Sequence, residues 1–173
     1  MAVIEVALRT MLAVVFGVAF ISKARSRAAF AEFASSLGGI RWLTGGKRLI
    51  ASVAIPVLEA AVTVLLIVPS AVPWAFGAGA VLLTGFTVVT ASEVAKGHEI
   101  RCRCFGASGG QLGPAQVARN LVLLALAIAG LALAPASHGA VGAAGLIIAI
   151  GLALLAGVAI IRWDDLASLV SAP

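Results

Sequence analysis

Residues 3–21 read VIEVALRTMLAVVFGVAFI and are followed closely by Lys23, Arg25 and Arg27. As a helix that rises 1.5 Å per residue, this run is long enough to cross about 30 Å of hydrocarbon. It is too long for the apolar part of a cleavable signal peptide, and no basic residue precedes it. We therefore expect a signal anchor whose amino terminus lies outside, because basic residues hold its second end inside.

The remainder of the chain repeats this pattern. Of its 173 residues, 62% are hydrophobic and 11% are charged, whereas a typical soluble domain is about 25% charged. Four more apolar runs of spanning length lie at Leu49–Pro69, Pro73–Ala91, Val117–Ala134 and Ala140–Ile161. The sequence predicts an all-α membrane bundle of about five transmembrane helices, formed by residues 1–173 as one domain.

The connections between these runs are of two kinds. Residues 68–73 and 134–139 are short and contain proline, which is typical of tight hairpins. Residues 22–48 are longer and basic, and their apolar side chains recur at helical spacing, so an amphipathic segment in the membrane interface is expected. The apolar positions are Phe30, Phe33, Leu37 and Ile40. Residues 92–116 form a second long, polar connection that is rich in glycine and serine.

The positive charges predict the sidedness of the protein. The chain has 12 Lys and Arg against 7 Asp and Glu, and nine of the 12 lie on the two long connections. With five spans these connections share one side, which the positive-inside rule assigns to the cytoplasm together with the carboxyl terminus. Nucleic-acid binding is excluded as the reason for the basic excess, because no basic tail or basic–aromatic interleaving is present.

The second long connection contains the only two cysteines of the chain, in Cys102-Arg103-Cys104, followed by Phe105 and Gly106. Residues two apart can form a disulfide only through a small, strained ring, and strained disulfides are readily reduced. The flanking arginines favour the reactive thiolate. The pattern predicts a dithiol that cycles between its oxidised and reduced forms.

Three other readings of the cysteines stay open. A structural disulfide closing so small a ring would stabilise the fold little. A metal site would need two more ligands, and only His98 is near in the sequence. The thiols could also be inert. We expect no bound cofactor and no metal.

Charged residues within the spans are the second indication of a functional site. Glu59 lies in the middle of the second run, three residues after Pro56, and a carboxylate at that depth is expected to face the bundle interior. Lys23 could serve only as an interfacial anchor. Arg119 and Asn120 lie in the first turn of the fourth run, and their side chains are expected to remain exposed to water.

Glu5 and Arg9 are four residues apart in the first run, near its outer end. This spacing places the two side chains on one face of a helix, so we expect them to form an ion pair.

Together these pieces resemble the MauE family of methylamine-utilisation membrane proteins, which belongs with the DoxX-like group. The matching pieces, in order over about residues 10–120, are Val14 to Phe16 with Ser22-Lys23, Pro56-x-x-Glu59, Cys102-x-Cys104-Phe105-Gly106 and Arg119-Asn120. The resemblance implies thiol–disulfide chemistry beside a thioredoxin-like partner, in the maturation of a disulfide-rich dehydrogenase subunit.

The leading hypothesis is therefore a membrane thiol–disulfide oxidoreductase in the lipid bilayer. Its candidate catalytic residues are Cys102 and Cys104, and its supporting residues are Glu59, Arg103, Phe105, Gly106 and Lys23. Disulfides form outside the cytoplasm, whereas the charge bias places the dithiol inside. Either electrons cross the membrane, or the dithiol loops back into the bundle and is reachable from both sides. The alternatives are a non-redox assembly factor or scaffold for a partner enzyme, and a small transporter that uses Glu59.

Overall fold

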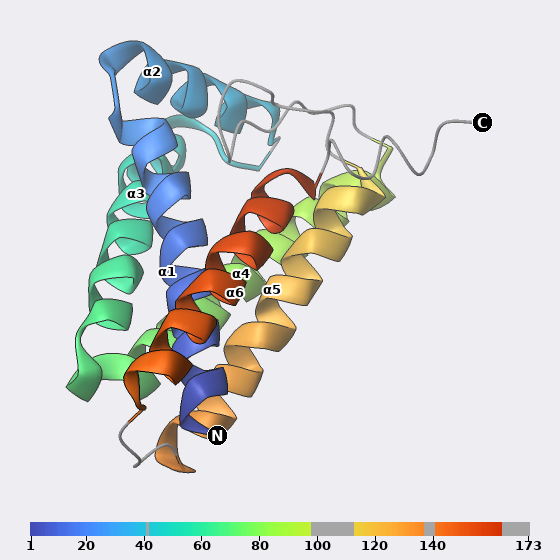
Figure 1. Cartoon of the computed structure of the whole chain (residues 1–173). Helices are drawn as coiled ribbons and strands as arrows, with labels where there is room; N and C mark the ends of the chain where they lie inside the picture. Colours follow the sequence, from blue (N-terminus) through green and yellow to red (C-terminus); the bar gives the residue numbers. More distant parts are fainter. Residues whose placement is uncertain (41, 98–112, 137–140, 164–173) are drawn as a thin grey trace.

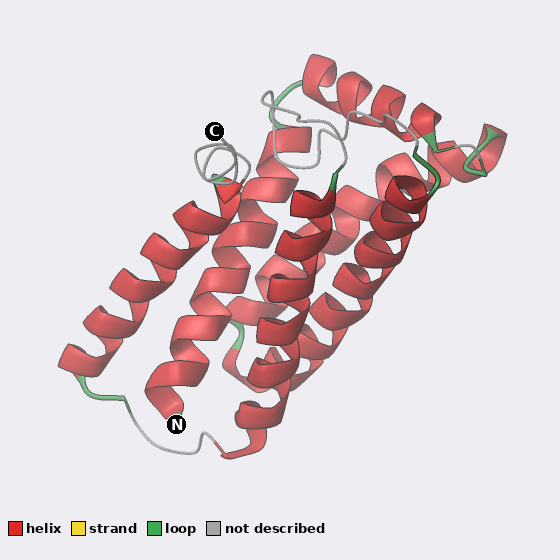
Figure 2. Ribbon diagram, turned by 90° about the vertical axis from the view of Figure 1, so that its right-hand side faces the viewer, coloured by secondary structure: helices red, strands yellow, loops and turns green. Residues whose placement is uncertain are grey.

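The computed structural model describes residues 1–40, 42–97, 113–136 and 141–163, and these residues contain no strand (Figure 2). Five described helices are long and apolar enough to cross a membrane. They are α1 (Ala2–Ala24), α3 (Gly45–Ile67), α4 (Val72–Ala95), α5 (Pro114–Leu133) and α6 (Ala143–Ile161). A shorter helix, α2 (Arg27–Ser36), and the 3₁₀ turns η1 (Leu37–Gly39), η2 (Pro69–Ala71) and η3 (Ala134–Ala136) join them. The predicted all-α fold with about five spans is confirmed.

The helix ends differ from the predicted ends by up to four residues, and two differences matter for the site. Helix α4 continues to Ala95 instead of ending at Ala91, so Glu93 belongs to the helix and not to the loop. Helix α5 begins at Pro114 instead of Val117, because proline is favoured in the first turn, where its missing N–H costs nothing. Arg119 therefore lies in the second turn of α5.

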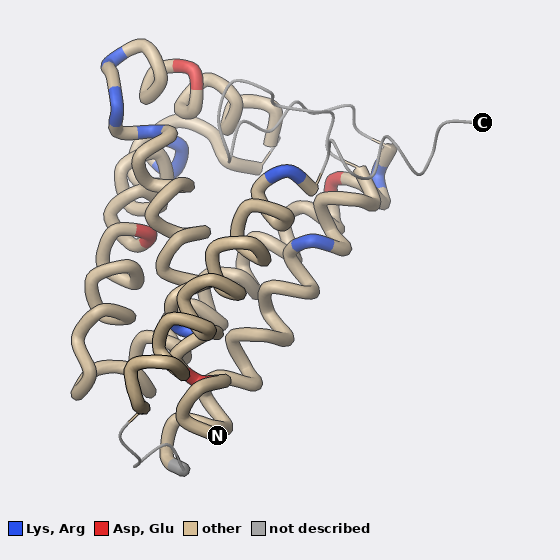
Figure 3. The backbone as a smooth tube through the Cα atoms, in the orientation of Figure 1, with Lys and Arg blue, Asp and Glu red and all other residues tan. Residues whose placement is uncertain are grey.

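Successive spanning helices run in opposite directions, so each of the five has one end at the same end of the bundle (Figure 1). There α1, α4 and α6 end, and α3 and α5 begin. We call this the basic end, because the described Lys and Arg lie mostly there, while the amino terminus lies at the opposite end (Figure 3). The helices with the most extensive contacts are α1 with α3 and α6, and α4 with α5. Helix α3 also contacts α4, and α1 also contacts α5.

The bundle interior is filled by apolar side chains from several spans. Phe16 of α1, Leu66 of α3, Phe76 of α4 and Leu123 of α5 belong to one buried cluster. Glycine allows close approach within it, since a Cβ on Gly79 would lie 3.4 Å from the Phe16 ring. Membrane bundles depend on such close contacts, because lipid chains are as apolar as the side chains they would replace.

Helix α2 lies across the basic end of the bundle (Figure 1). It begins at the N-cap Ser26, whose hydroxyl accepts a hydrogen bond of 3.0 Å from the Ala29 amide. Phe33 and Leu37 are buried together with Leu43 in a small second cluster. The expected amphipathic segment is thus a short helix with a 3₁₀ turn that packs on the bundle, and it is neither a strand nor a span.

The outer surface of the spanning helices is apolar. Large apolar side chains are exposed along each of them, among them Ile4, Val57, Val81, Ile128 and Leu155. A soluble protein rarely exposes apolar patches of this extent. Since the surface and the helix lengths agree, the five long helices are transmembrane and their exposed apolar side chains face lipid.

Candidate functional site

A buried ion pair joins α1 and α3 near the basic end. The Nζ atom of Lys23 lies 2.9 Å from Oε1 and 3.0 Å from Oε2 of Glu59, and it donates a hydrogen bond to each. The two side chains are only 1% and 2% exposed. Glu59 therefore faces the bundle interior as expected, while Lys23 is wholly inside the protein. Of the two readings of Lys23, its burial does not fit an anchor at the membrane interface.

The geometry of two antiparallel helices brings these residues together. Side chains on a helix lean toward its own amino terminus. Lys23, in the last turn of α1, leans into the bundle, and Glu59, in the middle of α3, leans toward the basic end. Residues 36 positions apart in sequence therefore meet.

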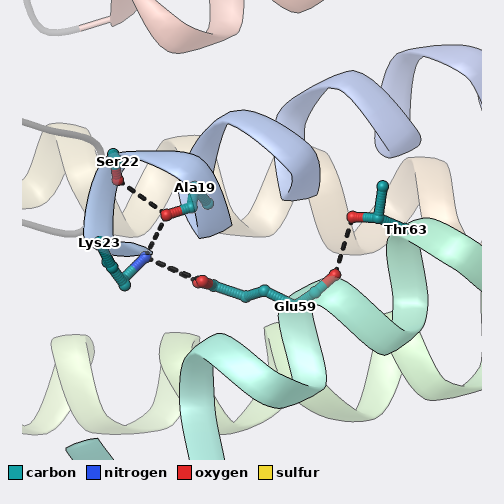
Figure 4. A network of polar contacts seen from close by, with 5 residues as sticks. All are labelled: Ala19, Ser22, Lys23, Glu59 and Thr63. Carbon is teal, nitrogen blue, oxygen red and sulfur yellow. Dashed lines mark hydrogen bonds and ion pairs between the residues drawn. The ribbon is translucent and has the colours of Figure 1, made fainter. Parts of the chain in front are cut away.

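Backbone and hydroxyl groups hold both partners in place (Figure 4). Lys23 Nζ also donates to the carbonyl of Ala19 at 3.0 Å, and the Ser22 hydroxyl donates to the same carbonyl at 2.7 Å. On α3, the Thr63 hydroxyl donates to the Glu59 carbonyl at 2.8 Å. These bonds fix the last turn of α1 and the middle of α3 around the pair.

Helices α2 and α5 complete the surroundings of Lys23. The Lys23 Nζ atom lies 5.2 Å from the centroid of the Phe33 ring, within range of a cation–π contact. Arg119 of α5 is close enough for its positive charge to repel the Lys23 ammonium. Arg119 and Asn120 are each only 6% exposed, so the expectation that both stay wet is wrong. They are buried because α5 starts one turn earlier than predicted.

A second acidic side chain is buried at the same end. Glu93 of α4 is 0% exposed, and its Oε1 accepts a hydrogen bond of 3.1 Å from Lys96 Nζ. Because the sequence predicts that the third span ends at Ala91, it places Glu93 in a polar loop and does not indicate it as a site residue. The signal that could have found it is the i, i+3 spacing of Glu93 and Lys96 at the end of an apolar run.

Near the other end of the bundle, the predicted ion pair between Glu5 and Arg9 is not formed. Glu5 is 7% exposed, and its Oε1 atom has no hydrogen-bond partner among the described residues. Arg9 stays partly exposed on the next turn of α1.

The predicted catalytic segment lies outside the described residues. This applies to Cys102, Arg103, Cys104, Phe105 and Gly106. The chain enters that segment from α4 and leaves it into α5, and both of these helix ends are at the basic end. The described residues contain no group of three or more Cys, His, Asp or Glu side chains suited to hold a metal.

Buried charges of this kind are weak evidence for a purely stabilising role. A buried ion pair recovers its desolvation cost only with excellent geometry, and apolar side chains of similar size stabilise a fold as well or better. Ionisable groups inside a membrane bundle therefore indicate function by default. Here Lys23 and Arg119 are two buried cations, and Glu59 is the carboxylate paired with Lys23.

These features define a class: a small multi-pass α-helical membrane protein with a buried charge cluster at one membrane face. The model of the family described as methylamine utilisation protein MauE matches residues 1–133. The chain belongs to this family. It is 40% identical over 128 residues to the methylamine utilization protein MauE of Paracoccus denitrificans, and the match covers 71% of this chain. The chain spans 66% of the length of that relative. No solved structure matches the chain.

Proposed function

We propose that this protein is a membrane thiol–disulfide redox protein that supports the maturation of a disulfide-containing partner in methylamine utilisation. The observation that carries the proposal is the buried cluster of Lys23, Glu59 and Arg119, which lies at the membrane end where the Cys-x-Cys segment begins and ends. The pathway follows from the family and from the name of the relative.

The chemistry is thiol–disulfide exchange. One thiolate of the Cys102–Cys104 pair attacks a sulfur of the partner's disulfide, forms a mixed disulfide and releases a partner thiolate. The second cysteine, as thiolate, attacks the mixed disulfide, so this protein gains a disulfide and the partner gains two electrons and, at neutral pH, two protons. The reverse sequence oxidises the partner, and the relative reduction potentials set the direction.

The buried cluster suits this chemistry in two ways. Cations near a thiol favour its thiolate form, and Lys23 and Arg119 bring two cations to the basic end. Glu59 neutralises Lys23 in the resting protein and can exchange a proton as the dithiol changes its charge. A thioredoxin-like protein is the partner that such a dithiol fits.

Replacing one cysteine at a time tests the proposal. With Cys104→Ser, we expect Cys102 to accumulate a mixed disulfide with a thioredoxin-like partner, because no second thiol resolves it, and vice versa for Cys102→Ser. Both variants should stop formation of the client's disulfides. The measurement is non-reducing electrophoresis after acid quenching, with identification of the trapped partner by mass spectrometry. If both variants mature the client fully and trap nothing, the protein acts instead as a non-redox scaffold.

We further propose that the amino terminus lies outside and the basic end faces the cytoplasm, since positively charged segments stay inside. The test uses single cysteines in a background without Cys102 and Cys104. Ser70→Cys, in the exposed turn η2, should react with an impermeant maleimide on intact cells, and Lys47→Cys, at the start of α3, should react only after permeabilisation. The opposite pattern would reverse the orientation.

A further inference from the structure

A groove lies between the basic-end segment 33–43, the first half of α3 and the second half of α4. It encloses about 320 Å³ and its walls are almost entirely apolar. Phe33 and Leu37 form its roof, Ile55 comes from α3, and Gly85 and Val89 come from α4. The roof places the groove within the leaflet on the basic side of the membrane.

The groove opens sideways to the bilayer. Val81, which is 74% exposed, forms part of its wall, and Gly85 is exposed as well. Water does not stay in an apolar cavity of this kind, since it would lose its hydrogen bonds there. The occupant therefore comes from the hydrocarbon of the bilayer. Because the roof closes the groove at the basic end, an acyl chain that ends inside the leaflet fits better than a partner helix that must pass through both faces.

Arg48, whose guanidinium is suited to bind phosphate, lies beside the roof. Arg48 lies on the same face of α3 as the groove residues Ala51 and Ile55, and its Nε donates to the carbonyl of Ala34 at 2.9 Å. Its guanidinium fills the space next to Gly38, where a Cβ would come within 2.8 Å of Nη1. No described residue accepts a hydrogen bond from either Nη atom, so the planar guanidinium can donate to two oxygens of a phosphate.

The charges around the groove favour an anionic headgroup. Lys47 is exposed next to Arg48, and the Lys96 side chain is 52% exposed at the end of α4. The one carboxylate in the groove wall is Glu93, which is buried and bound by Lys96. Because Lys96 offsets Glu93, the remaining positive charge at this end of the groove comes from Lys47 and Arg48 at the start of α3.

We propose that this groove binds one acyl chain of an anionic phospholipid from the surrounding leaflet, with the lipid phosphate held by Arg48. Phe33 connects this lipid to the charge cluster, since its ring both lines the groove and faces Lys23. The proposal does not depend on the redox function.

Photocrosslinking in a bilayer tests the proposal. The protein is reconstituted into phosphatidylcholine vesicles that contain a small fraction of phosphatidylglycerol with a photoactivatable group in its chain. Crosslinks within residues 81–89 should exceed those on the lipid-facing side of α6 about tenfold, the ratio that a free-energy difference of 1.4 kcal/mol produces. With a phosphatidylcholine probe the excess should fall. Equal labelling of α4 and α6 by the phosphatidylglycerol probe would overturn the proposal.

Two glycines of α4 provide a matched pair of variants. A Cβ on Gly85 or on Gly77 would meet nothing within 4 Å, so a side chain can start without a clash at both positions, but only Gly85 lines the groove. Gly85→Leu should reduce the labelling of residues 81–89 to the level of α6, and Gly77→Leu should leave it unchanged. Arg48→Gln should remove the preference for phosphatidylglycerol, and Arg48→Lys should keep part of it. Retained labelling in Gly85→Leu, or a copurifying polypeptide crosslinked in place of lipid, contradicts the proposal.

Discussion

Glu59→Leu is expected to lower the free energy of unfolding by about 3–5 kcal/mol, the cost of leaving one partner of a buried ion pair unpaired. The variant leaves the Lys23 ammonium inside the bundle without its carboxylate, hydrogen-bonded to the Ala19 carbonyl and near the positive charge of Arg119. The measurement is the unfolding equilibrium of the purified protein in detergent micelles, together with its steady-state level in the membrane. Lys47→Met is the matched control, because Lys47 is exposed at the same end of the bundle.

The double variant Lys23→Met with Glu59→Leu separates stability from function. Removing both charges together should restore most of the lost stability, since apolar side chains of similar volume replace a buried pair at little cost. If the pair serves the dithiol, the folded double variant still fails to mature the client. Full client maturation by the double variant would show that Lys23 and Glu59 have no part in the redox chemistry.

The number and position of the spanning helices could be predicted from sequence because hydropathy dominates at membrane depth. A backbone in hydrocarbon must satisfy its own hydrogen bonds, so any apolar run of about 20 residues is helical. The ends were less certain, as the end of α4 illustrates. Ser92 and Glu93 read as loop residues, but α4 continues past them, and Glu93 is buried with Lys96 as its partner.

The pairing of Lys23 with Glu59 could not be predicted in the same way. Each residue was recognised as part of a family pattern, and the burial of Glu59 follows from its depth in the second run. Which cation pairs with Glu59 depends on how far α1 and α3 are shifted and rotated relative to each other. Side-chain packing determines that arrangement, and a hydropathy pattern carries no information about it. The same reason explains why Arg119 and Asn120 were expected in water although they are buried.

Gly130→Ala is expected to be the most destabilising glycine-to-alanine substitution in the bundle. A Cβ at this position would overlap Cε1 and Cζ of Phe76 and would lie 2.6 Å from its Cδ1. Phe76 is 0% exposed and packs within the main apolar cluster, so its ring has no space into which to turn. Overpacking of a close-packed core costs about 1–3 kcal/mol, and we expect the upper end because the contact joins α4 to α5, its main neighbour. The expected result is a lower unfolding free energy in detergent and less protein in the membrane.

Two companion variants give this prediction its control. Gly151→Ala, in α6, adds the same methyl group where nothing lies within 4 Å, so it should not lower stability. Phe76→Leu combined with Gly130→Ala should recover part of the loss, because a shorter side chain leaves room for the new methyl group. If Gly130→Ala is as stable as Gly151→Ala, the close approach of α4 and α5 at Phe76 is wrong. The position of α5, and with it the place of Arg119 beside Lys23, would then need to be revised.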